Sequence, residues 1–143
     1  MFIRQLCLWS LGISAIGLLW GCGTSDARPS AILQGTVTLN GKPLEEGSVR
    51  FTSTKTGETA YANLEAGGRY SVEMPEVDLG EDYLIAVGQT IVDETDAMAL
   101  AANPPAPMTV KIPAKYAERT TSGLSLTIDQ PGVHSFDIEL KGS

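Results

Sequence analysis

The chain has 143 residues, with 10 basic and 17 acidic side chains and a formal net charge of −7. This acidic balance argues against nucleic acid as a partner, because binding to phosphates requires a basic face. The cysteines, Cys7 and Cys22, both lie near the N-terminus. They predict no disulfide framework, so a domain further along the chain must be stabilised by its core.

Residues 1–21 have the pattern of a secretory signal peptide. Arg4 supplies the positive charge, and an almost wholly apolar stretch continues to Trp20. Residues 18–22 (LLWGC) resemble a lipobox, although Trp20 replaces its usual small residue. The resemblance implies cleavage before Cys22 and lipidation of this cysteine. Two alternatives stay open: an uncleaved membrane anchor, and an ordinary signal peptide followed by an incidental cysteine.

Residues 22–31 are small and polar, and they predict a lipidated, flexible tether. From Ile32 onward, apolar residues recur at every second position, which is typical of half-buried strands. The tight sequence Asn40-Gly41 indicates a turn after the first of these strands. Strands are expected at residues 32–39, 49–52, 60–64, 70–74, 83–89, 108–112, 124–128 and 136–141. The nearly continuous apolar run at 83–89 predicts a strand that is covered on both faces.

Residues 91–107 break this pattern and form the longest irregular segment. A short helix is expected at 97–102, capped by Asp93 or Thr95 and ended by the proline-rich residues that follow. The seven or eight short strands with close turns predict an all-β, antiparallel sandwich or small barrel. A parallel sheet is not expected, because its crossover connections need more residues than the turns provide.

Several segments resemble known families. Residues 35–44 (GTVTLNGKPL), 47–51 (GSVRF) and 68–72 (GRYSV) resemble the opening of carboxypeptidase-regulatory-like domains. Residues 112–116 (IPAKY), 121–124 (TSGL) and 136–140 (FDIEL) complete a combination similar to small secreted lipoproteins of planctomycete-type bacteria. The resemblance covers residues 32–141. It implies a prealbumin-like (transthyretin-like) Greek-key β-sandwich that is usually non-catalytic, and it implies no defined activity.

No catalytic, metal-binding or cofactor-binding residue is expected. His134 is the single histidine, and it shares its strand face with Phe136, Ile138 and Leu140. No motif supplies the partner that a catalytic histidine needs, so a structural role at the start of the last strand is expected. One histidine also excludes a zinc carboxypeptidase site and the multi-histidine purine hydrolase site known on transthyretin-like folds.

The remaining candidates are carboxylates and tyrosines. Asp93, Glu94 and Asp96 offer oxygen ligands but lack the spacing of a calcium loop, so a solvated loop is favoured. The same interpretation applies to the carboxylates Glu76, Asp78, Glu81 and Asp82. Tyr70 is expected in the core, whereas Tyr61 is expected on the surface, where it could stack on a sugar ring. The other tyrosines are Tyr83 and Tyr116.

We therefore expect a lipid-anchored, non-catalytic β-sandwich module that contacts the membrane through Cys22 and binds or scaffolds an envelope partner. A carbohydrate-binding surface is the alternative, and an enzyme with an unrecognised site is a third hypothesis. In enterobacteria, an aspartate after the lipidated cysteine holds a lipoprotein in the inner membrane. By resemblance to this sorting rule, Gly23 favours the outer membrane.

Overall fold

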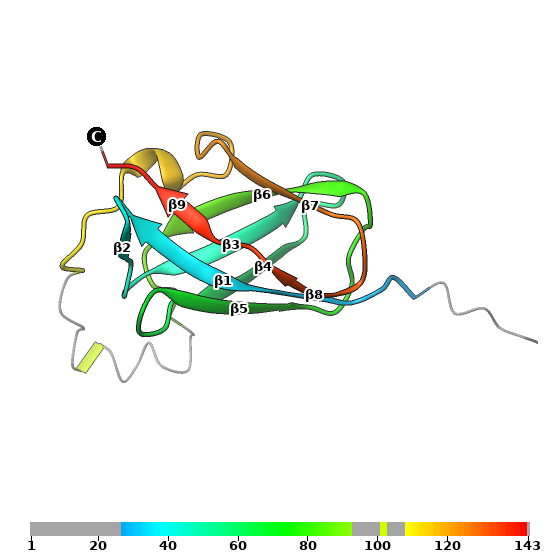
Figure 1. Ribbon diagram of the computed structural model, residues 1–143, viewed down its shortest axis with the longest axis horizontal. Coiled ribbons are helices and arrows are strands. Elements are labelled where there is room, and N and C mark those ends of the chain that lie inside the picture. Colours follow the sequence, from blue (N-terminus) through cyan, green and yellow to red (C-terminus); the bar gives the residue numbers. More distant parts are fainter. Residues whose placement is uncertain (1–26, 93–100, 103–107, 143) are drawn as a thin grey trace, which may run out of the picture.

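The computed structural model describes residues 27–92, 101–102 and 108–142. These residues form a five-stranded and a four-stranded sheet, which face each other as a β-sandwich (Figure 1). The first sheet contains β1 (Ala31–Leu39), β2 (Lys42–Pro43), β5 (Arg69–Met74), β8 (Gly132–Ser135) and β9 (Ile138–Leu140). The second contains β3 (Ser48–Ser53), β4 (Thr59–Asn63), β6 (Glu81–Gly88) and β7 (Leu124–Ile128). The all-β prediction is confirmed. Residues 1–26, and with them the expected signal peptide and Cys22, lie outside the described residues.

Strand β1 is the centre of the first sheet. It pairs antiparallel with β5 and β2, and parallel with β8 and β9. The parallel pairing corrects the expectation of a purely antiparallel fold. The parallel pairing follows from the path of the chain. Strand β7 ends in the second sheet, and the turn after it brings the chain to the first sheet, where β8 begins beside the start of β1. The Gly132 N–H donates to the Ser30 carbonyl at 3.1 Å, so both strands start at the same end of the sandwich.

The alternating pattern of the sequence is confirmed in β1 and β5. In β5 the residues alternate strictly between exposed and buried, and in β1 Leu33 and Val37 are fully buried while Ile32 faces outward. Asn40 and Gly41 adopt φ values of 52° and 77°, and this left-handed pair forms the two-residue turn between β1 and β2.

The second half of β6 is buried on both faces, as its apolar run predicted. Side chains of the inner face contact the first sheet, and the segment around the 3-10 helix η1 (Ala114–Tyr116) lies against the other side. Two hydrogen bonds hold this segment to the sheet. The Ser122 hydroxyl donates to the Ile85 carbonyl of β6, and Arg50 of β3 donates from Nη2 to the Ala117 carbonyl at 2.9 Å.

The strand expected at 108–112 is absent, because these residues form an irregular connection to η1. Strands β3 and β7 pair with the two edges of β6, so residues 108–112 have no free edge of β6 to pair with. Of the helix expected at 97–102, only Ala101 and Ala102 are described, and both are helical. Its capping residues and the acidic residues Asp93, Glu94 and Asp96 lie outside the described part of the chain.

The last strand is divided, in contrast to the continuous strand expected at 136–141. Strand β8 ends at Ser135 and β9 begins at Ile138. Between them, Phe136 and Asp137 cross Gly35 of β1, where the missing side chain admits the Phe136 carbonyl. Phe136 is only half-buried, which corrects its expected place in the core, whereas Ile138 and Leu140 are buried as expected.

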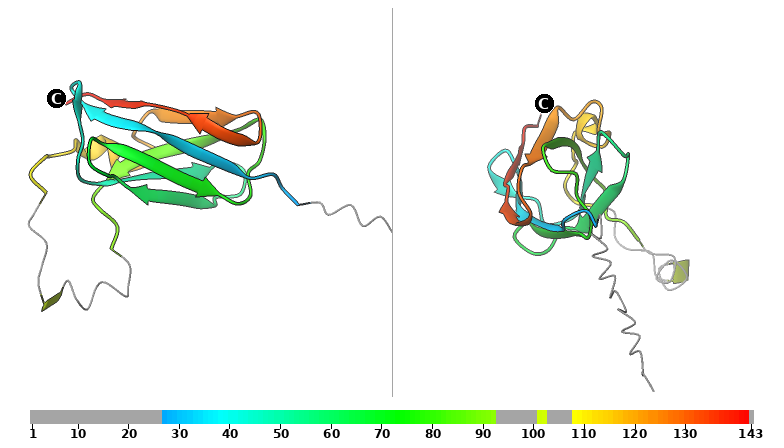
Figure 2. Two further views of the ribbon diagram at one scale, coloured as in Figure 1. Left: turned by 60° about the horizontal axis from the view of Figure 1, so that its bottom comes forward. Right: turned by 90° about the vertical axis from the view of Figure 1, so that its right-hand side faces the viewer.

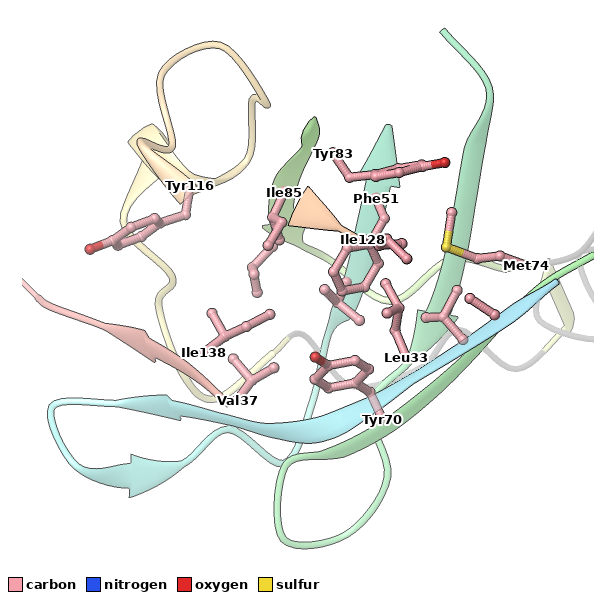
Figure 3. Packing of buried hydrophobic residues seen from close by; sticks show 14 of the residues in the cluster. Leu33, Val37, Phe51, Tyr70, Met74, Tyr83, Ile85, Tyr116, Ile128 and Ile138 are labelled. Atoms are coloured by element: carbon pink, nitrogen blue, oxygen red, sulfur yellow. The ribbon is translucent and has the colours of Figure 1, made fainter. Parts of the chain in front are cut away.

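A single apolar core fills the space between the sheets (Figure 3). Phe51 of β3 and Tyr70 of β5 are in contact across it, with ring centroids 5.8 Å apart. Leu33, Ile85 and Ile128 complete its centre and are all fully buried. Burial of this many large side chains supplies the hydrophobic stabilisation that the sequence requires of a domain without a disulfide framework.

Four segments meet at one end of the sandwich (Figure 2). We call it the N-terminal end, because one of these segments, residues 27–30, leads into β1 there. The others are residues 54–58, 75–80 and 129–131. Hydrogen bonds tie them together: Thr54 N–H donates to the Asp82 carbonyl at 3.0 Å, and Gly80 N–H donates to the Ile128 carbonyl at 2.8 Å. This end carries the candidate site.

Candidate ligand-binding pocket

A pocket of about 390 Å³ opens at the N-terminal end of the sandwich. It lies where β4 of one sheet meets β5 of the other, two strands that are neighbours without being paired. Its lining combines apolar and charged side chains: Glu58, Thr59, Ala60, Met74, Pro75, Glu76 and Tyr83. A concave site with an apolar lining and a few charged groups is the usual form of a binding site in proteins.

The floor of the pocket is largely apolar and buried. Met74 and Tyr83 are both almost fully buried, and Figure 3 shows them at the same end of the core. The Tyr83 hydroxyl accepts a hydrogen bond from the Asp78 N–H at 2.9 Å, so its polar atom is satisfied by the neighbouring loop. Strand β4 contributes Thr59 and Ala60 to the lining, and the side chain of Ala60 is small.

The rim of the pocket is an ion-pair cluster around Arg28. Its guanidinium binds both carboxylate oxygens of Glu58, at 2.9 and 3.2 Å, and also binds Glu76. A third carboxylate, Asp78, lies 3.5 Å from Arg28 and 3.3 Å from the Lys55 ammonium. The hydrogen bond from Arg28 lowers the pKa of Glu58, and the same two glutamates raise the pKa of Arg28.

This cluster was not predicted. Glu76 and Asp78 were interpreted as separate solvated carboxylates, but the structure brings them together with Glu58 on one guanidinium. Glu81 and Asp82 lie outside the cluster, and Asp82 instead accepts a hydrogen bond from the Thr127 hydroxyl at 2.6 Å. Arg28 is 30 residues from Glu58 and 48 from Glu76, so no local spacing in the sequence indicates the cluster.

The position of Arg28 also corrects the boundary of the tether expected at residues 22–31. Strand β1 begins at Ala31, and the residues before it are held by the domain. The Pro29 carbonyl accepts a hydrogen bond from Val77 N–H at 2.7 Å, and the Ser30 carbonyl accepts one from Gly132 N–H. The folded unit therefore includes residues 28–31.

The other residues singled out in the sequence lie elsewhere. His134 is half-buried in β8, and its Nε2 donates to the Gln130 carbonyl at 2.7 Å, which is a structural contact. Tyr70 and Tyr116 are buried, whereas Tyr61 is 46% exposed. Tyr61 lies opposite Arg50 in the register of β3 and β4, on the outer face of the second sheet.

Two further findings describe the chemistry of the described residues. They contain no group of three or more His, Cys, Asp or Glu side chains arranged to hold a metal ion. In the part of the chain that the structure describes, no helix has the length and apolar character needed to cross a membrane.

In comparisons with known proteins, no protein-family model matches the chain, and no curated protein matches it.

Proposed function

We propose that this chain is a lipid-anchored β-sandwich module of the bacterial cell envelope, which binds an envelope partner and does not catalyse a reaction. The signal peptide at 1–21 directs export, and Cys22 carries the lipid. The domain belongs with carboxypeptidase-regulatory-like domains and has their prealbumin-like Greek-key topology, as the segments at 35–51 and 68–72 suggest. Gly23 sends the protein to the outer membrane.

The observation that carries this proposal is the pocket beside residues 27–30. Six residues of extended chain reach about 20 Å, so a lipid on Cys22 would keep Arg28 and the pocket rim close to the bilayer. A pocket at this end is within reach of other components of the same membrane. An apolar floor with charged groups at its mouth is suited to recognition of such a component.

The anchor is tested by replacing Cys22 with alanine and following incorporation of labelled palmitate. The variant should remain an unprocessed precursor without label, whereas Cys7→Ala, inside the leader, should be labelled and processed normally. Undiminished label in Cys22→Ala would refute the anchor. Recovery of the processed wild type mainly with inner-membrane markers on a density gradient would refute the outer-membrane assignment.

Binding is tested by capture of partners from detergent-solubilised envelope with the full chain. A retained protein supports the proposed partner-binding function, whereas a retained polysaccharide supports carbohydrate binding instead. The second function has one observation in its favour, because Tyr61 presents an exposed aromatic ring beside Arg50 on a sheet face. Loss of polysaccharide capture in Tyr61→Ala would identify that face as the carbohydrate site.

A further inference from the structure

The rim of the pocket already holds a cation, and that cation belongs to the chain itself. Arg28 makes a two-pronged contact with Glu58 and a further contact with Glu76, and both glutamates line the pocket. This is the geometry with which carboxylates recognise a guanidinium in any protein complex. The two glutamates therefore have the arrangement that binds an arginine side chain, and Arg28 occupies it.

The Arg28 side chain can leave the rim without unfolding its surroundings. Its side chain is 32% exposed, and those of Glu58 and Glu76 are 60% and 53% exposed. Ion pairs in such exposed positions contribute little to stability, so exchange for another cation costs little. The path of the main chain is held separately, by the backbone hydrogen bonds of Pro29 and Ser30 to Val77 and Gly132.

The N-terminal end carries more acidic than basic side chains, even with Arg28 included. Two basic residues, Arg28 and Lys55, lie in the four segments of the N-terminal end and the first two residues of β6. The same segments and residues contain six carboxylates: Glu58, Glu76, Asp78, Glu81, Asp82 and Asp129. This excess of negative charge favours approach of a basic partner and disfavours an acidic one.

Strand β4 offers main-chain contacts beside the pocket. It is the edge strand of the second sheet, and no strand in the described part of the chain pairs with its outer side. Its first residues, Thr59 and Ala60, line the pocket. Extended peptides add to such edges through backbone hydrogen bonds, while neighbouring pockets select their side chains.

We propose that this pocket binds an extended, basic peptide segment of the envelope partner. An apolar side chain of the peptide packs on the floor formed by Met74 and Tyr83. A neighbouring arginine of the peptide replaces Arg28 in the ion pairs with Glu58 and Glu76. Arg28 thus acts as an intramolecular competitor that restricts the site to segments carrying both features. The inference rests on the proposed function and specifies the partner's chemistry and its docking face.

The test uses the full chain in detergent and a labelled eight-residue peptide that carries one leucine and one arginine, measured by fluorescence anisotropy at low salt. Glu58→Gln with Glu76→Gln should weaken binding about tenfold or more, because the peptide arginine loses both carboxylates. Arg28→Ala should tighten binding about fivefold, because the internal competitor is removed. Glu65→Gln with Glu139→Gln is the charge-matched control: both side chains are exposed and neither lines the pocket, so binding should be unchanged.

The opposite signs of these effects decide the inference. Weaker or unchanged binding to Arg28→Ala overturns the exchange. An equal loss of binding with the Glu65→Gln, Glu139→Gln control overturns the site, because only net charge would then matter. Circular dichroism melts establish that each variant is folded. The proposed function is judged separately, by partner capture from envelope. If the wild type and the double glutamine variant retain the same partner equally, the envelope function stands and the pocket assignment is wrong.

Discussion

Gly35→Ala should be among the most damaging single changes in this protein. Gly35 lies within β1, where the divided last strand crosses it, and a Cβ atom there would lie 2.1 Å from the Phe136 carbonyl oxygen. Ordinary contacts between such atoms begin at about 3.4 Å, so the crossing segment must move by more than 1 Å. The nearest atoms belong to the backbone, and rotation of a side chain cannot relieve the clash.

The cost follows from what that movement disturbs. Three hydrogen bonds hold the crossing: Tyr70 donates to the Phe136 carbonyl, Phe136 N–H donates to the Gln34 carbonyl at 2.8 Å, and Thr36 N–H donates to the Asp137 carboxylate at 2.8 Å. Overpacking alone typically costs about 1–3 kcal/mol, and each weakened hydrogen bond about 1 kcal/mol. With three such bonds, we therefore expect a loss of about 4–6 kcal/mol in the free energy of unfolding.

Gly88→Ala is the matched control. Gly88 also lies in a strand, but a Cβ atom there would meet only the Arg50 guanidinium, at 3.7 Å. This substitution should change stability by less than about 1 kcal/mol, and reduced freedom of the unfolded chain favours stabilisation. Urea denaturation followed by circular dichroism measures both variants. Equal midpoints for Gly35→Ala and the wild type would refute the close crossing on which the fold of the first sheet depends.

Three further predictions follow from the core and the rim. Tyr70→Phe should lower the free energy of unfolding, measured by urea denaturation, by about 1–2 kcal/mol, because the Phe136 carbonyl loses its hydrogen-bond donor. Burial raises the pKa of the Tyr70 hydroxyl, which keeps it protonated and able to donate. Ile138→Ala should cost about 2–4 kcal/mol, and half-buried Phe136→Ala should cost less; the reverse order would contradict the divided strand. The hydrogen bond from Arg28 holds the pKa of Glu58 below its ordinary value of 4.5. The ion pair therefore contributes its full stabilisation above pH 4.5. This contribution is lost as the pH falls through the lowered pKa of Glu58. The urea midpoint of the wild type should therefore fall more steeply in acid than that of Arg28→Ala, and superimposable pH profiles would contradict this role.

The sequence by itself determined which face of β1, β5 and β9 is buried. Alternation of apolar and polar residues is a local property, and a shift by one residue would expose the whole apolar set. This is why the burial of Leu33, Val37, Tyr70 and Ile138 could be read from the pattern before any pairing was known. The all-β class followed from the same alternation and from the short turns between its segments.

Only the tertiary structure decided how these strands pair and which polar residues meet. The segment 108–112 alternates as regularly as the true strands, but it lies outside the sheets because β3 and β7 pair with β6 instead. The division of the last strand at Phe136 depends on its crossing of Gly35, about a hundred residues earlier in the chain. Likewise, Arg28 contacts Glu58 and Glu76 because the two sheets bring their three segments together at one end of the sandwich. Contacts between such distant residues depend on the path of the whole chain and on the entropy lost in closing long loops, which no local pattern encodes.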